Sequence, residues 1–184
     1  MVKTEMVEQA TYKFRALRAE EVDASYDVYQ RVRDWLRANE IRIWLSPLPK
    51  EKFVARQTRG ELFGAFCDEK LATIFALVHE MPDYWAPEIG LKPQWWLTTL
   101  ATAPEFRGKQ IGRRAIVWTM NHLQAVGVEE LYLDCACGFL PNFYASCGFR
   151  AVAVKAVSFP SGNTYELTLM KRPVRPRQDS SVTV

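Results

Sequence analysis

Residues 101–112 read ATAPEFRGKQIG and separate an apolar, strand-like run from a run with helical periodicity. A strand, a glycine-bearing turn and a helix N-terminus together form an anion site, because the first helical turn leaves about four backbone N–H groups unpaired. Gly108 and Gly112 would let a phosphate reach this backbone, since neither carries a side chain. Positive charge comes from Arg107, Lys109 and Arg113. The stretch predicts a phosphate-binding loop, with a basic, solvated turn as the alternative.

The sequence on either side predicts one α/β domain with an α+β mixed sheet. Apolar patterns of strand type occur at residues 12–17, 61–68, 70–80, 95–102, 131–135, 149–157 and 164–171. Helices are predicted at residues 20–38, 50–59, 112–126 and 142–147. The intervening residues 81–94, rich in proline and aromatic residues, are predicted to form a loop. This order of elements is typical of a central twisted mixed β-sheet flanked by helices on both faces.

The composition narrows the classes of partner. A chain of 184 residues favours one domain, and 48% hydrophobic with 24% charged residues is an ordinary globular balance. The net charge of +3 is too small to indicate nucleic acid as the partner. There is no apolar run of about 18 residues for a membrane span, and the N-terminal residues lack the apolar segment of a secretory signal. We therefore expect a cytoplasmic protein with neither nucleic acid nor a membrane as partner.

The cysteines do not predict a metal site. A zinc site usually needs C-x-x-C with a second pair or two histidines, whereas Cys135 and Cys137 form a single C-x-C. The two histidines, His79 and His122, lie far away in sequence. We therefore expect all the thiols, at residues 67, 135, 137 and 147, to be small buried groups in a reducing compartment, with no metal.

The run LATAPEFRGKQIGRRAI, followed after the next predicted strand by FYASCGF, resembles the GNAT superfamily of acyl-CoA-dependent N-acetyltransferases. The family signature is [Q/R]-x-x-G-x-[G/A], with Arg107 at its first position here and Gly112 at its last. The resemblance implies a single GNAT domain over residues 12–171 and an acyltransferase that uses acetyl-CoA (coenzyme A) as cosubstrate. Its acceptor would be a primary amine of a small molecule or peptide. Residues 172–184 have no apolar pattern and are predicted to be a disordered tail.

The resemblance also implies where coenzyme A binds. Its pyrophosphate would lie on the backbone amides of residues 108–113, and its pantetheine would pair like an extra strand with the end of the fourth strand. The implied binding residues are Leu100, Ala101, Thr102, Arg107, Gly108, Lys109, Gln110, Ile111, Gly112 and Arg113. Gln110 departs from the signature, which has glycine there. A negative φ would tolerate this side chain, whereas a positive φ would strain the loop by roughly 1 kcal/mol or more.

Two side chains are candidates for moving protons. The resemblance implies that Tyr144 is the acid that protonates the departing thiolate; the alternative is an aromatic residue that only packs on the sheet. Asp134 lies on the opposite strand face from Leu131 and Leu133, and relatives carry a carboxylate here as base. Its alternatives are a strand-end acid that caps the next helix, or a water that relays the proton. His79 is a reserve base, although a lone histidine more often has no catalytic role.

The acceptor site and the activity itself remain open at this stage. The stretch DYWAPEIGLKPQWW carries aromatic residues and two acids that could bind a cationic amine: Asp83, Tyr84, Trp85, Glu88, Trp95 and Trp96. Equally, the tryptophans could fill the core or a homodimer contact. The alternative function is a non-catalytic acyl-CoA-binding or interaction protein whose site has drifted, as Gln110 would indicate.

Overall fold

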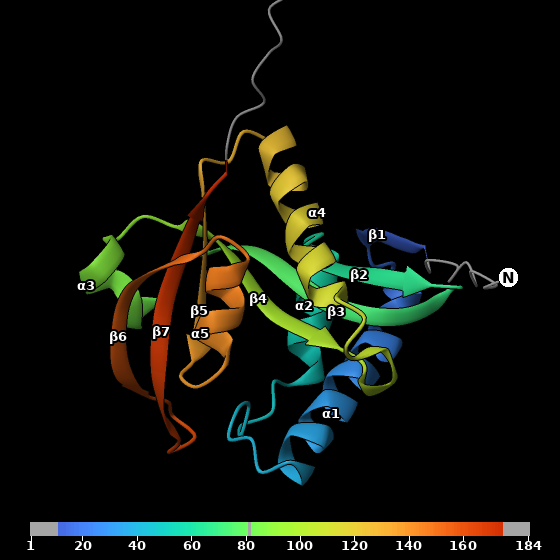
Figure 1. The fold of residues 1–184 in the computed structure, drawn as a ribbon, viewed down its shortest axis with the longest axis horizontal. Helices are drawn as coiled ribbons and strands as arrows, with labels where there is room; N and C mark the ends of the chain where they lie inside the picture. The colour runs from blue at the N-terminus through green and yellow to red at the C-terminus, as the bar shows by residue number, and fades with distance from the viewer. Residues whose placement is uncertain (1–10, 81, 175–184) are drawn as a thin grey trace, which may run out of the picture.

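The computed structural model describes residues 11–80 and 82–174, which build a seven-stranded sheet between helices (Figure 1). The strands are β1 (Tyr12–Ala16), β2 (Leu62–Cys67), β3 (Lys70–Glu80), β4 (Gln94–Thr102), β5 (Glu130–Ala136), β6 (Arg150–Ser158) and β7 (Thr164–Pro173). Their order across the sheet is β1-β2-β3-β4-β5-β7-β6. All neighbouring strands are antiparallel except β4 and β5, which are parallel. The prediction of a mixed sheet is confirmed.

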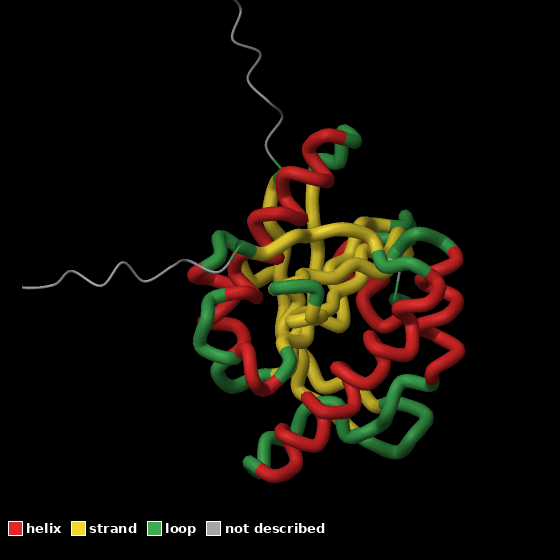
Figure 2. The backbone as a smooth tube through the Cα atoms, turned by 90° about the vertical axis from the view of Figure 1, so that its right-hand side faces the viewer, coloured by secondary structure: helices red, strands yellow, loops and turns green. Residues whose placement is uncertain are grey.

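Helices cover both faces of the sheet, as Figure 2 shows. The helices are α1 (Val22–Ala38), α2 (Lys50–Thr58), α3 (Ala86–Ile89), α4 (Ile111–Ala125) and α5 (Leu140–Ser146). Two hydrophobic cores result, one on each face. The first includes Tyr29 of α1 and Phe53 of α2, and the second includes Ile116 and Leu123 of α4. The apolar stripes of the sequence thus become the contacts that hold the helices to the sheet.

The segment between β3 and β4 is more ordered than the predicted loop. A 3-10 turn at Asp83–Trp85 leads directly into α3. Trp85 is completely buried, and its indole Nε1 donates to Oδ2 of Asp134 at 2.8 Å. A buried indole needs such a partner for its N–H, so a contact distant in sequence fixes this turn. The local sequence pattern gives no indication of this contact.

Two predicted boundaries are also corrected. The helix predicted at residues 112–126 runs from Ile111 to Ala125, and the Val126 side chain is 61% exposed. Strand β7 continues to Pro173, two residues beyond the predicted strand at residues 164–171, because Pro173 pairs with Glu130. The rest of the predicted tail, residues 175–184, lies outside the described residues.

Strands β4 and β5 separate soon after they begin to pair. Their register contains only Trp95 with Leu131 and Trp96 with Tyr132. Beyond these pairs the two strands diverge (Figure 1). The rest of β4 therefore has a free backbone edge on this side, and the separation opens space in the middle of the sheet.

A cluster of charges fixes the start of α1. Arg15 of β1 donates from Nη1 and Nη2 to the two carboxylate oxygens of Glu21 at 2.7 and 2.6 Å. The backbone N–H of Arg18 donates to the same carboxylate at 2.8 Å. Only 13% of the Glu21 side chain is exposed, and these bonds lower its pKa to about 2, with the Arg15 bond as the largest cause.

We expect Glu21→Gln to lower the free energy of unfolding at pH 7 by about 1–2 kcal/mol, since it removes charge-assisted bonds. Because the pKa of Glu21 is lower in the folded chain, its contribution is complete above pH 4.5 and is lost as pH falls toward 2. The variant should therefore show a flatter acid limb in urea unfolding between these pH values. Glu20→Gln leaves the Glu21 contacts intact and is the control. An unchanged acid limb in Glu21→Gln would contradict this assignment.

Candidate active site

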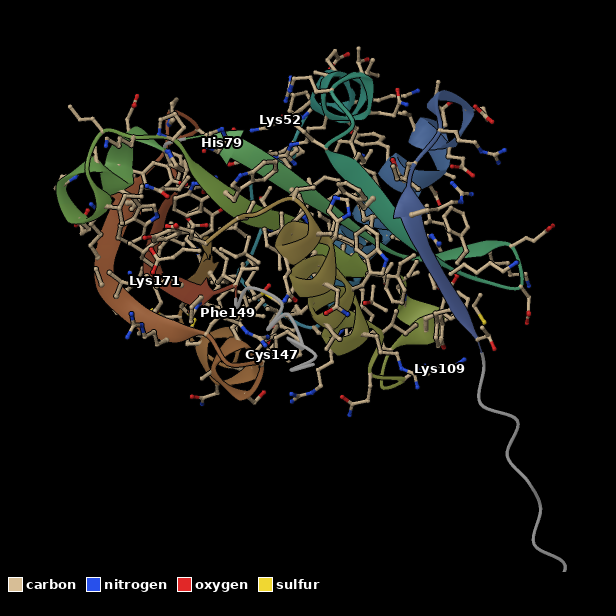
Figure 3. The ribbon with its side chains drawn as sticks, turned by 90° about the horizontal axis from the view of Figure 1, so that it is seen from above. Lys52, His79, Lys109, Cys147, Phe149 and Lys171 are labelled. Atoms are coloured by element: carbon tan, nitrogen blue, oxygen red, sulfur yellow. The ribbon has the colours of Figure 1, made fainter. Side chains whose placement is uncertain are left out.

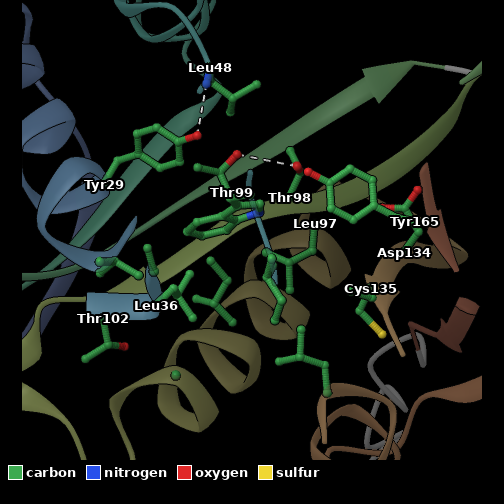
Figure 4. A pocket seen from close by; sticks show the side chains of 18 of the residues that line it. Tyr29, Leu36, Leu48, Leu97, Thr98, Thr99, Thr102, Asp134, Cys135 and Tyr165 are labelled. Carbon is green, nitrogen blue, oxygen red and sulfur yellow. Dashed lines mark hydrogen bonds between the residues drawn. The ribbon is translucent and has the colours of Figure 1, made fainter. Parts of the chain in front are cut away.

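A cavity of about 1250 Å3 occupies the space where β4 and β5 separate. Figure 4 shows Thr99 of β4 and Asp134 of β5 on different sides of it. The cavity brings together residues from β4, the 103–113 loop, α5, α1 and α2. It includes most of the predicted binding residues, namely Leu100, Ala101, Thr102, Arg107, Gly108, Gln110, Ile111, Gly112 and Arg113. Both predicted catalytic residues, Asp134 and Tyr144, also line it.

Different physical reasons explain why positions 108 and 112 of the loop are glycine. Gly108 has a φ of 76°, a left-handed conformation that favours glycine. Gly112 has no positive φ, and a Cβ built on it would meet only Phe143 Cζ, at an ordinary 3.6 Å. Neither backbone conformation nor internal crowding therefore requires glycine at position 112. A bare backbone at the N-terminus of α4, on the wall of a cavity, fits close approach by an anionic ligand such as a pyrophosphate.

Gln110 has a positive φ, the more strained of the two backbone conformations considered for it. Its φ of 60° and ψ of 17° are left-handed, and it immediately precedes α4. This conformation disfavours a residue with a Cβ by about 1–2 kcal/mol. Its side chain is held by Arg113, whose Nε donates to Gln110 Oε1 at 3.1 Å. The loop thus keeps the backbone shape that glycine would give, in spite of the substitution.

The two arginine side chains of the loop contact other residues of the chain. The guanidinium of Arg107 lies 3.1 Å from the centroid of the Trp35 ring. Arg113 donates to the backbone oxygen and hydroxyl of Ser146 at 2.9 and 2.7 Å. Lys109 does not line the cavity, and Figure 3 shows it at the outer edge of the molecule. An anion at this loop would therefore be bound mainly by backbone N–H groups.

A bulge shapes the adjoining part of β4. Ala76 pairs with Thr98 and Ile74 pairs with Ala101, so β4 has one more residue than β3 between these points. Within this stretch Thr99 has a φ of 57°, and it is buried. A bulge bends its strand and leaves backbone groups unpaired. The sequence contains no glycine here, and threonine favours regular strands, so the local pattern does not indicate the bulge.

Asp134 is held in an apolar environment by two neutral donors. Its Oδ2 accepts hydrogen bonds from Tyr84 Oη at 3.0 Å and Trp85 Nε1 at 2.8 Å. Burial raises the pKa of this carboxyl, and the two hydrogen bonds offset part of the rise. The helix-capping alternative is wrong, because Phe139 stands at the N-cap of α5. A carboxylate with a raised pKa is a better proton acceptor near neutral pH than an ordinary one.

Tyr144 is half-buried on α5 and lines the same cavity. Its ring makes edge-on contacts with Phe143 and Phe149, so it also packs as an ordinary aromatic residue. Burial is the largest cause that raises its pKa, followed by the neighbouring Cys135. The hydroxyl therefore stays protonated at neutral pH and can donate a proton or a hydrogen bond into the cavity.

The other candidates from the sequence lie elsewhere. His79 is exposed, stacks on Trp95 with ring centroids 5.2 Å apart, and does not line the cavity. Trp96 is buried in the first core, and the Glu88 carboxylate is paired with Lys155 at 2.9 Å. Of the aromatic residues proposed for the acceptor site, only Tyr84 lines the cavity. The tryptophans mainly pack in the cores, which was one of the alternatives to a role in acceptor binding.

Sequence reasoning missed a roof over the cavity. The roof consists of residues 39–49, which follow α1, and the turn between β6 and β7. Leu45 N donates to Tyr165 Oη at 2.9 Å. Ser46 Oγ is bonded to Ser161 Oγ at 2.7 Å and accepts from Asn163 Nδ2 at 2.6 Å. These partners are more than a hundred residues apart in sequence, so no local pattern could indicate the contact.

The described residues contain neither a metal-binding cluster nor a membrane helix. No group of three or more histidine, cysteine or acidic side chains within residues 11–80 and 82–174 could hold a metal ion. All the cysteines are free thiols; Cys135 and Cys147 are buried, whereas Cys67 is half-buried and Cys137 is exposed, contrary to expectation. In the part of the chain that the structure describes, no helix is long and apolar enough to cross a membrane.

Comparison with known proteins connects this geometry to one family. The model of the acetyltransferase (GNAT) family matches residues 16–149. No sequence among curated proteins matches the chain significantly. Solved structures share the fold at low sequence identity.

The first example is the ribosomal-protein-S18-alanine N-acetyltransferase from Escherichia coli, with a TM-score of 0.68 at 16% identity, covering 95% of this chain and 100% of that one. A GNAT-family acetyltransferase from Listeria monocytogenes has a TM-score of 0.70 at 15% identity, covering 88% and 94%. The PaiA N-acetyltransferase from Thermoplasma acidophilum, in complex with coenzyme A, has a TM-score of 0.63 at 19% identity, covering 89% and 99%.

We expect Gly112→Ala to separate binding from folding. Because its Cβ has space, the variant should unfold with an unchanged free energy or one raised by up to about 1 kcal/mol. If a pyrophosphate approaches this backbone, its affinity for free coenzyme A should fall at least about 10-fold in titration calorimetry. Gly108→Ala is the contrasting variant, since its left-handed φ should reduce stability by about 1 kcal/mol. Unchanged affinity in Gly112→Ala would overturn the loop assignment.

Proposed function

Since this chain belongs to the GNAT family of acetyltransferases, we propose that it transfers an acetyl group from acetyl-CoA to a primary amine of a small molecule or peptide. Family membership makes it an acyltransferase. One observation supports this proposed function more than any other. Asp134 and Tyr144 line one cavity with the glycine-bearing N-terminus of α4, at the point where β4 and β5 separate.

The residues of the cavity fit an acyl-CoA. A pyrophosphate would bind the backbone N–H groups around Gly112, and the bare α-carbon there supports close approach. Beyond Trp96 the free edge of β4 offers Leu100 to Thr102 for pairing with the extended pantetheine. The structurally similar PaiA N-acetyltransferase was solved with coenzyme A, which favours the same ligand for this fold. When bound, acetyl-CoA supplies the acetyl thioester.

Asp134 is the proposed base. An alkyl amine with a pKa near 10.4 is mostly protonated at pH 7 and must lose a proton before it can attack a carbonyl carbon. Asp134 would accept this proton, directly or through a water, and its raised pKa suits that role. Overall, an N–C bond forms and a C–S bond breaks. The ammonium gives up two protons, of which one is released and one balances the proton that the thiol gains.

Tyr144 is the proposed acid. A departing thiolate, whose thiol has a pKa of about 8.5, is stabilised when a hydroxyl donates to its sulfur. Tyr144 projects from α5 into the cavity that also holds the β4 edge, and burial keeps its hydroxyl protonated. The non-catalytic alternative, a drifted acyl-CoA-binding protein, predicts that the Tyr144 hydroxyl is irrelevant to any turnover.

We expect Tyr144→Phe to lower kcat about 100-fold, because it removes the proton donor and leaves the ring packing intact. Its dissociation constant for acetyl-CoA should stay within about threefold in calorimetry, since the hydroxyl would act mainly after binding. Thiol release with a screened amine acceptor is the rate assay. Tyr12→Phe, which lies outside the cavity, is the matched control. Wild-type turnover in Tyr144→Phe would remove Tyr144 from the mechanism.

We expect Asp134→Asn to lower kcat/KM by about 100-fold or more and to abolish the acid limb of the pH–rate profile. Activity requires the ionised carboxylate, so the wild-type rate should fall as pH drops through the raised pKa of Asp134. Tyr84→Phe provides an independent check. It removes a hydrogen bond that lowers the Asp134 pKa, so the limb should move to higher pH. A profile that neither variant alters would assign the base elsewhere.

A further inference from the structure

One buried cation in the cavity has no assigned role so far. Arg56 of α2 is only 3% exposed and lines the cavity together with Thr99. Its Nη1 donates to Thr99 Oγ1, on the bulge of β4, at 2.8 Å. This is the single hydrogen bond that its guanidinium makes to another described residue, although a guanidinium carries five N–H donors.

The rest of this guanidinium is accessible from the cavity. Among the sealed side-chain nitrogens and oxygens of the described residues, only Thr119 Oγ1 lacks a partner. Nε and Nη2 of Arg56 have no partner among those residues either, so they must retain accessible surface. Because Arg56 is otherwise buried, that surface faces the cavity.

No carboxylate in the described part of the chain neutralises this charge directly. Glu61 is occupied by Arg59, with an N–O distance of 2.6 Å. Burial lowers the pKa of Arg56 and the charge of Glu80, which also lines the cavity, raises it, but among the described residues the two side chains form no salt bridge within 4.0 Å. A buried charge without a partner is strongly unfavourable, so such a site suits an anion that arrives with a ligand.

A second cation reinforces the first. Lys52 lies one helical turn before Arg56 and also lines the cavity. Burial and the charge of Arg56 both lower the pKa of Lys52, and the charge of Glu80 offsets part of this shift. The α2 side of the cavity thus has two cations near one carboxylate, Glu80, and a net positive charge, whereas Asp134 lies on the β5 side.

The roof limits what can occupy this end of the cavity. The bonds of Ser46 with Ser161 and Asn163 join residues 39–49 to the β6–β7 turn. Tyr165, which accepts from Leu45, lines the cavity below. While these contacts persist, a polypeptide cannot pass between the two loops. On this side the closed passage favours a small acceptor over a protein segment threaded between the loops.

We propose that the acceptor is a small primary amine that also carries a carboxylate, as in an amino acid. Its carboxylate would bind Nε and Nη2 of Arg56, with Lys52 nearby, and its amine would face Asp134. A planar guanidinium pairs with a carboxylate through two parallel hydrogen bonds, and this geometry fixes orientation as well as charge. The inference rests on the proposed transferase function and narrows its substrate class.

The rival occupant is a cationic amine bound by Glu80. In that case Glu80 would supply the anion of the cavity, and a second ammonium on the acceptor would be favoured. The two classes differ in charge, so matched compounds distinguish them. The panel consists of α- and ω-amino acids, the primary amide of each, and simple diamines.

The first experiment uses the wild-type chain. Titration with free coenzyme A comes first, because absence of binding would overturn the proposed function itself. With coenzyme A bound, the thermal shift produced by each amine measures acceptor binding without turnover, and thiol release from acetyl-CoA measures kcat/KM. We expect at least a 10-fold preference for an amino acid over its own amide in both readouts. Coenzyme A binding with a preference for amides or diamines, or with no carboxylate-bearing amine bound, would overturn this inference alone.

The second experiment uses variants of α2. Arg56→Met should lower kcat/KM for the amino acid about 100-fold and change that for its amide less than threefold, with coenzyme A affinity unchanged. Arg56→Lys keeps the charge but loses the bidentate guanidinium, so its kcat/KM for the amino acid should lie between those of the wild type and Arg56→Met. It takes the place of Arg56→Met if that variant does not fold. Arg59→Gln removes a cation outside the cavity and is the matched control. Equal losses for acid and amide in both Arg56 variants would mean that Arg56 is only structural.

Discussion

The early separation of β4 and β5 is the constraint on which the rest of the structure depends. Two parallel strands in the middle of a sheet would normally pair along their length, yet here only Trp95 and Trp96 find partners. The sheet stays intact because β4 remains bonded to β3, and β5 to β7. The unpaired ends of the two strands leave backbone donors and acceptors exposed to a cavity. Such groups are favourable only if water or a ligand bonds them, so the fold itself creates a binding surface for an extended molecule.

The polar groups in this opening are held by neutral partners. Asp134 accepts from a phenol and an indole, and Arg56 donates to a threonine hydroxyl. An opposite charge at either position would satisfy each group and leave it inert. Neutral hydrogen bonds instead orient the side chains while their charge remains available to a third molecule. This arrangement lowers the stability of the empty protein and is typical of sites selected for function over stability.

Local patterns in the sequence were sufficient for the elements and for part of the site. Strands β2 and β3, helix α1 and the loop before α4 depend on residues close together in the chain, and the sequence predicts each of them. The bulge at Thr99, the buried Arg56 and the roof depend on contacts between distant segments, which periodicity cannot reveal. His79 shows that chemical suitability alone does not identify a base, because this side chain is exposed and does not line the cavity. The conformation of Gln110 was undecidable from the sequence, since the loop imposes a φ that the residue itself disfavours.

The roof has a consequence for how molecules enter and leave. The hydrogen bonds that join its two loops are made by hydroxyl and amide groups, several of them exposed, whereas Ile43, Trp44 and Leu48 pack against the first core. Bonds of this kind exchange with water at little net change in free energy, so the joint can part while both hydrophobic cores stay packed. The two loops of the roof would therefore part at the contacts of Ser46 with Ser161 and Asn163, while residues 39–49 stay packed against the first core.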